Sequence, residues 1–102
     1  MNDKKYDEYK PVVKFYSLNN SIYFNYNNNF LYANMETINN LKNELIYPCK
    51  ITFYDLSIND IVKIIDIILD SNIKLYCYRI KENNKNIYNA VFIENEKIKK
   101  IE

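Results

Sequence analysis

Four side chains in this sequence are candidates for catalysis or metal binding because of their type and position. Asp66 and Asp70 are four residues apart in a helical pattern, so one helix face carries two carboxylates that could share a Mg²⁺ ion. Cys49 and Cys77 could act as nucleophiles if a neighbouring Lys lowered the pKa of the thiol. Lys63 falls on the same helical stripe as the two Asp residues, so a solvated charged face is the favoured interpretation. For both thiols a structural role is favoured over a catalytic one.

The residue types that are missing exclude most catalytic sites. The 102 residues include no His, which excludes Ser–His and Cys–His nucleophile pairs and zinc sites that use His. They include no Gly, which excludes the Gly-rich loops that hold phosphates and dinucleotides, because a Cβ atom blocks the approach of the backbone. We therefore expect a protein that is not an enzyme and that needs neither a cofactor nor a metal.

The 11 tyrosines are more informative than the acidic residues and the thiols. Successive residues of a strand point to opposite faces, so each predicted C-terminal strand has an aliphatic side and a tyrosine-bearing side. If helices cover the aliphatic side, the other face carries tyrosines with lysines at their fringe. These residues are Tyr54, Tyr76, Tyr78 and Tyr88, with Lys50 and Lys74.

Three interpretations of this tyrosine-bearing face stay open. It can be purely structural, because Tyr is a good strand residue whose ring is half-buried and whose hydroxyl stays wet. It can be a protein-binding surface, because rigid tyrosines supply contact area at low entropy cost. It can also stack bases, as RNA-recognition modules do. Ile51–Leu56 resembles the first conserved strand of that fold, whereas Lys85–Phe92 lacks the Gly–aromatic alternation of its other conserved strand.

The elements that position these residues follow from the hydrophobic periodicity. We predict strands over 12–18, 22–26, 51–54, 73–81 and 87–94, with a last short strand over 97–101. A first helix begins at the N-cap residue Asn34 and runs to Tyr47, where Pro48 stops it. A second helix, 58–70, begins after Ser57 and is apolar around most of its circumference, so we expect it to lie between the sheet and the first helix.

The order of these elements, ββ(β)αβαββ(β), defines the fold class. Residues 50–81 form a βαβ unit whose strands we expect to be parallel. We therefore predict an α+β fold, a two-layer sandwich of a mixed β-sheet with two helices on one face. Residues 1–10 are interpreted as a flexible N-terminal segment and residues 11–102 as a single domain.

We expect Asn to occupy the turn positions that Gly occupies in other sequences. Tight turns need residues with positive φ, and Asn tolerates that region best after Gly. The candidate turns all contain Asn: Asn19–Asn20, Asn27–Asn29, Asn72, Asn83–Asn84 and Asn95.

The charge disfavours nucleic acid as a partner, and the apolar pattern indicates a cytoplasmic location with no membrane partner. The formal net charge of +1 and the single Arg make nucleic acid a less favoured partner. The polar start of the chain shows no secretory signal, and the longest apolar stretch is too short to span a membrane.

The functional hypothesis is a small non-catalytic binding module that acts by covering the surface of a protein or ribonucleoprotein partner. Its predicted contacts are Tyr54, Tyr76, Tyr78, Tyr88, Lys74, Asp66 and Asp70. The 18 Asn, 16 Ile and 13 Lys residues have A/T-rich codons and indicate an AT-rich genome. Such a chain is typical of an inhibitor from a phage or mobile element (an anti-defence, anti-CRISPR-type antagonist) or of an immunity or antitoxin protein. The alternatives are binding of single-stranded nucleic acid through the tyrosine-bearing face, and a homodimer joined through the sheet or its edges.

Overall fold

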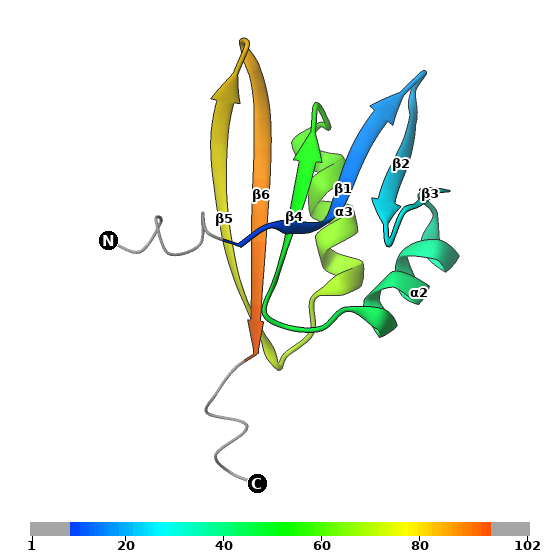
Figure 1. The fold of residues 1–102 in the computed structure, drawn as a ribbon, viewed down its shortest axis with the longest axis vertical. Coiled ribbons are helices and arrows are strands. Elements are labelled where there is room, and N and C mark those ends of the chain that lie inside the picture. The colour runs from blue at the N-terminus through cyan, green and yellow to red at the C-terminus, as the bar shows by residue number, and fades with distance from the viewer. Residues whose placement is uncertain (1–8, 95–102) are drawn as a thin grey trace, which may run out of the picture.

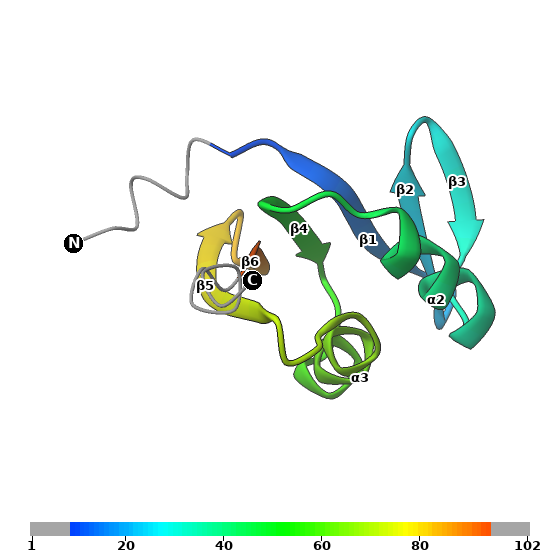
Figure 2. The same cartoon turned by 90° about the horizontal axis from the view of Figure 1, so that it is seen from below.

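The chain builds one mixed sheet with two helices packed on one of its faces (Figures 1 and 2). The computed structural model describes residues 9–94. The strands are β1 (Pro11–Leu18), β2 (Ser21–Tyr26), β3 (Asn29–Tyr32), β4 (Cys49–Tyr54), β5 (Ile73–Glu82) and β6 (Lys85–Glu94), and the helices are α2 (Met35–Glu44) and α3 (Ile58–Ile68). The predicted α+β fold class is confirmed. The strand predicted over 97–101 lies outside the described residues.

The strands lie in the order β3-β2-β1-β4-β6-β5, and the central pair, β1 with β4, is parallel. All other neighbours are antiparallel. As expected for a βαβ unit, β4 and β5 run in the same direction, because β6 is antiparallel to both. They are not neighbours, however, because the hairpin formed by β5 and β6 places β6 between them.

Asparagine does form the tight turns. Each of the three hairpins turns through two consecutive residues of positive φ: Asn19–Asn20, Asn27–Asn28 and Asn83–Asn84. Two positive φ angles in a two-residue loop define the type I′ turn, whose twist matches that of the flanking strands. Asn72 serves differently, because its backbone N–H donates to the Asp70 carboxylate (2.9 Å) at the end of α3.

Both helices begin where the sequence predicts and end earlier. The side chain of Asn34 accepts from the backbone N–H of Thr37, whose hydroxyl accepts in return from the backbone N–H of Asn34, a complete capping box. The predicted extension of this helix to Tyr47 is wrong, because Leu45 is extended (φ −68°, ψ 138°) and the chain then leads into Pro48. Ile46, expected on the buried face, is therefore 83% exposed.

The prediction that the second helix lies between the sheet and the first helix is wrong, because α2 and α3 lie side by side on the same face of the sheet (Figure 2) and the outer face of α3 is exposed, with Ile58 60% and Val62 49% accessible. The hydroxyl of Ser57 accepts from the backbone N–H of Asp60 (3.2 Å) at the start of α3. Its buried face consists of Ile61, Ile64, Ile65 and Ile68. The predicted end at Asp70 is wrong, because Leu69 already has an extended backbone. Among residues 9–94, no helix combines the length and the apolar character that crossing a membrane requires.

The neighbouring strands β4 and β6 are buried on both faces where their middle residues pair. On the helix side, Ile51, Phe53 and Phe92 are fully inaccessible. On the other side, Thr52 and Asn89 are also buried, and the Thr52 hydroxyl donates to the Asn89 side-chain oxygen (2.7 Å). The amino-terminal end of β1 crosses this part of the sheet in front of β4 and β6 (Figures 1 and 2).

The positive φ angles in the turns predict opposite effects of two substitutions at Asn20, whose φ is 66°. Asn20→Ala should lower the free energy of unfolding by about 1 kcal/mol, because a Cβ atom is strained in the left-handed region. Asn20→Gly should leave it equal or higher. Denaturant unfolding measures both values, and equal effects of Ala and Gly would contradict the assigned turn.

Candidate functional site: an aromatic sheet face

The first three strands place aromatic rings on both faces of the sheet. Phe15 and Phe24 are opposite each other on β1 and β2 and belong to the buried core under the helices. The next pair along the same two strands, Tyr16 and Tyr23, therefore points to the opposite face. On β3, Tyr32 pairs with Tyr23, which places Tyr32 and Phe30 on that face as well.

These rings contact one another in a continuous aromatic row that runs from β3 to β4. We define the aromatic row as Tyr32, Tyr23, Phe30, Tyr16 and Tyr54. Ring centroids are 5.6 Å apart for Tyr32–Tyr23, 5.4 Å for Tyr23–Phe30, 6.2 Å for Phe30–Tyr16 and 5.2 Å for Tyr16–Tyr54. Two of the contacts are nearly parallel stacks, with interplanar angles of 7° (Tyr23–Phe30) and 8° (Tyr16–Tyr54). Offset stacks at such distances are favourable beyond the area that they bury.

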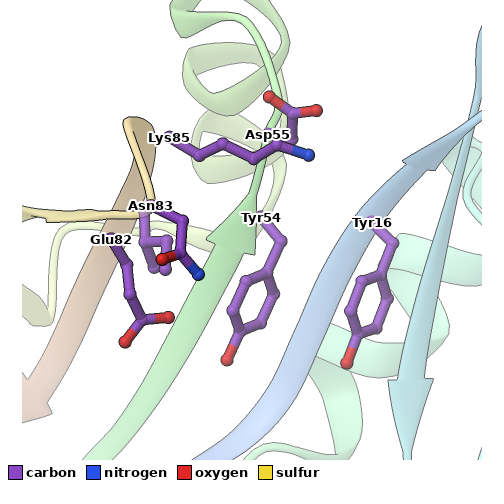
Figure 3. A pocket seen from close by; sticks show the side chains of 7 residues that line it. Tyr16, Tyr54, Asp55, Glu82, Asn83 and Lys85 are labelled. Atoms are coloured by element: carbon purple, nitrogen blue, oxygen red, sulfur yellow. The ribbon is translucent and has the colours of Figure 1, made fainter.

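The aromatic row is accessible to solvent along its length. Phe30 and Tyr32 are each 53% exposed, and the other three rings are half-buried. Tyr16 and Tyr54 lie side by side in front of the sheet, with the helices behind it (Figure 3). The solvated face of a sheet is ordinarily polar, and an apolar patch of this kind is uncommon unless something binds to it.

The row ends in an open hollow of about 310 Å³ at the carboxyl end of β4. Tyr16 and Tyr54 form one side, and the tip of the β5–β6 hairpin forms the other with Glu82, Asn83 and Lys85 (Figure 3). Asp55 and Ile87 complete the lining. Asp55 has a φ of 65°, a left-handed conformation in which the chain turns from β4 towards α3. The hollow thus adds polar groups of both charges to the end of an aromatic surface.

Of the predicted contact residues, only Tyr54 belongs to the aromatic row. Tyr76, Tyr78 and Lys74 lie on the same face of the sheet but on β5, two strands away from β4. Between them lies the buried strip that contains Thr52 and Asn89. Tyr78 also contacts this strip, because the Lys50 ammonium group lies 5.5 Å from the centre of its ring.

The predicted place of Tyr88 is wrong. Tyr88 is opposite Phe53 on β4 and Arg79 on β5, so it points to the helix side, where it packs partly buried against the core. The prediction assigned the more aliphatic side of this strand to the helices. Because β6 is buried on both faces, that rule fails: Val91 is fully buried on the side away from the helices.

Asp66 and Asp70, two of the predicted contact residues, do not lie beside the aromatic row. Asp66 is exposed on α3, which lies on the opposite side of the sheet from the aromatic row, and Asp70 is also exposed. Asp70 lies beyond the end of α3, where its carboxylate accepts the N–H of Asn72. Within residues 9–94, no group of three or more potential ligands is placed to hold a metal ion.

The two thiols differ in access. Cys49 is buried, and burial raises the pKa of its thiol to about 11, so the thiol stays protonated near neutral pH. Cys77 is exposed on β5, although partial desolvation of its sulfur also raises the pKa of its thiol. Neither environment activates a nucleophile.

Four of the five rings in the row, all except Tyr54, are absent from the predicted contact residues. The signal was present in the alternation of β1, where Val13 and Phe15 oppose Lys14 and Tyr16. The alternation does not show which strand pairs with β1. That strand is β4, and it supplies Tyr54.

The chain matches no family model, no curated protein and no solved structure.

The different access of the thiols predicts a simple labelling result. The native protein should react with a thiol reagent at Cys77 only, and Cys49 should react after denaturation. Cys77→Ser is the matched control, and the native form of this variant should not react. Mass spectrometry of the labelled peptides identifies the site, and rapid native labelling of Cys49 would contradict the core described above.

Proposed function

We propose that this protein is a non-catalytic binding module that uses the aromatic row to cover part of a protein partner. The observation that carries the proposal is the row itself. Five contacting rings lie on a sheet face opposite the helices, and the two rings on the edge strand β3, Phe30 and Tyr32, are half-exposed. Aromatic side chains on a rigid scaffold are typical anchors of protein interfaces, because they bury a large area and lose little rotamer freedom.

The geometry of the rings favours a protein partner over nucleic acid. In the stacks Tyr23–Phe30 and Tyr16–Tyr54, a face of each ring is turned to its neighbour and is not available to a base. The charges around the hollow are mixed, with Asp55 and Glu82 beside Lys85. The single Arg, Arg79, pairs with Tyr88 on the helix side of the sheet.

The mode of action that fits such a surface is occlusion. A row of rings with a polar hollow at one end offers contact area and hydrogen-bonding hydroxyls, which is what inhibitors, immunity proteins and antitoxins require. The AT-rich codon composition extends the proposal to an anti-defence protein of a phage or mobile element, acting in the cytoplasm. The neighbouring genes test that extension: phage genes support an antagonist, and a toxin gene supports an antitoxin.

Loss of the exposed rings should abolish partner binding without unfolding the protein. Phe30→Ala and Tyr32→Ala remove side chains that are half-exposed at the edge of the sheet, so the melting temperature should change little. Affinity capture from the source organism or its phage-infected host, followed by mass spectrometry, should recover a partner with the wild type and lose it with the double variant.

Ile58→Ala is the matched control for that experiment. Ile58 is 60% exposed on α3, in the layer opposite the aromatic row, so its loss should leave capture unchanged. Equal capture by the wild type and the double Phe30/Tyr32 variant would contradict the proposal.

Binding of single-stranded nucleic acid is the second candidate, and one observation favours it. Lys14 lies on the same face as the row, directly beside Tyr16 in β1 and opposite Thr52 of β4. A cation next to open aromatic rings is a common arrangement in such proteins. This function requires oligonucleotide complexes at low salt that weaken steeply as salt is added, and a gel shift without a complex at low salt excludes it.

A further inference from the structure

The strand β5 forms one edge of the sheet (Figure 1). It has ten residues, whereas β3 at the opposite edge has four. It contains no Pro, and its pairing with β6 runs from Ile73 to Glu82 without a shift in register. Within residues 9–94, β5 pairs with β6 alone. Proteins usually shorten, bulge or interrupt such edges, because an unpaired edge recruits another strand.

The hairpin turn determines which residues of β5 direct their backbone outwards. In a two-residue type I′ hairpin the flanking residues, here Glu82 and Lys85, form the first hydrogen-bonded pair, and such pairs then alternate along the strands. The even-numbered residues of β5 therefore bond to β6. The N–H and C=O groups that point away from the sheet belong to Ile73, Leu75, Cys77, Arg79 and Lys81.

We propose that β5 pairs antiparallel with β5 of a second copy of this chain, about a two-fold axis at Tyr78. In this register Tyr78 faces Tyr78 of the second copy, Tyr76 faces Ile80, and Lys74 faces Glu82, each pair occurring twice except the central one. Tyr76 and Ile80 are 41% and 40% exposed in the single chain, so this pairing buries apolar surface on both copies.

The positions of the charges select this register. Lys74 and Glu82 lie four residues before and four residues after Tyr78, so one two-fold axis forms two opposite-charge pairs. These pairs are of the non-hydrogen-bonded type, in which opposing side chains approach most closely. The other two cations, Arg79 and Lys81, face Cys77 and Leu75 of the second copy, so no cation faces another. An axis at Cys77 instead places Lys74 opposite Ile80 and loses both ion pairs.

A dimer of this form leaves the aromatic row free, although Glu82, which lines the hollow, takes part in the dimer contact. The aromatic row lies on β1 to β4, and the paired edges lie beyond β6. Each dimer therefore presents two aromatic rows, and the dimer contact does not depend on the function proposed above.

Charge exchange tests the pairing. Sedimentation velocity of the full chain over a wide concentration range should show a dimer. Lys74→Glu or Glu82→Lys should weaken it about tenfold, because each change turns two opposite-charge pairs into two like-charge pairs. The double exchange Lys74→Glu/Glu82→Lys should restore the dimer. Lys63→Glu, the same charge change on exposed α3, is the control and should have no effect. A monomer at all concentrations, or single variants that dimerise like the wild type, would overturn the proposal.

Disulfide trapping tests the register. In the Cys77→Ser background, Tyr78→Cys should form an intermolecular disulfide under mild oxidation, because the two Cα atoms are about 4.5 Å apart in such a pair. The wild type, with Cys77 facing Arg79 of the second copy, should not form one. Efficient linkage through Cys77 with none through position 78 would overturn the axis at Tyr78.

Discussion

The parallel pairing of β1 with β4 is the constraint on which the rest of the structure depends. It joins the amino-terminal meander of β1, β2 and β3 to the carboxyl-terminal group of β4, β6 and β5. On the helix side the pair stacks Phe15 on Phe53, with centroids 5.2 Å apart, and on the other side it stacks Tyr16 on Tyr54 at the same distance. A slip of one residue would exchange the buried phenylalanines for the half-buried tyrosines. The core therefore fixes the register that also builds the aromatic row.

The two halves of the sheet differ in what covers them. Where the middle residues of β4 and β6 pair, both faces are buried, and a polar pair, Thr52 and Asn89, is satisfied by its own hydrogen bond inside the sheet. In β2 the helix side is buried at Phe24 and the other side carries Tyr23, whereas β3 is exposed on both faces and carries Phe30 and Tyr32 on the same side as Tyr23. The contacting rings of the aromatic row are thus confined to the amino-terminal half and to Tyr54 at its border, whereas the exposed Tyr76 lies apart from them on β5. This division separates the aromatic row from the β5 edge.

The sequence predicts the turns and helix starts of this protein, but it predicts little of the order in which the strands pair. Asn20 and Asn84 mark turns, and Asn34 and Ser57 mark helix starts, because each acts on its own neighbours in the chain. The neighbour of β1 and the insertion of β6 between β4 and β5 depend on contacts between distant segments, which periodicity does not encode. Tyr88 shows the consequence: its strand lies inside the sheet, and alternation then no longer tells which side faces the helices. The sequence predicts a tyrosine-bearing face of the sheet, but of the predicted residues only Tyr54 lies in the aromatic row.

The central claim is that an exposed aromatic row lies on the sheet face opposite the helices, and nuclear magnetic resonance tests it most directly. Nuclear Overhauser spectroscopy measures contacts between the ring protons of Tyr16 and Tyr54. A soluble paramagnetic agent then shows which rings are exposed to solvent. The structure predicts cross-peaks between these two rings, because their centroids are 5.2 Å apart. It also predicts that the resonances of Phe30 and Tyr32 broaden strongly, whereas those of the buried Phe15 and Phe53 do not. Absence of the Tyr16–Tyr54 contact, or protection of Phe30 and Tyr32 from the agent, would show that the exposed aromatic row does not exist.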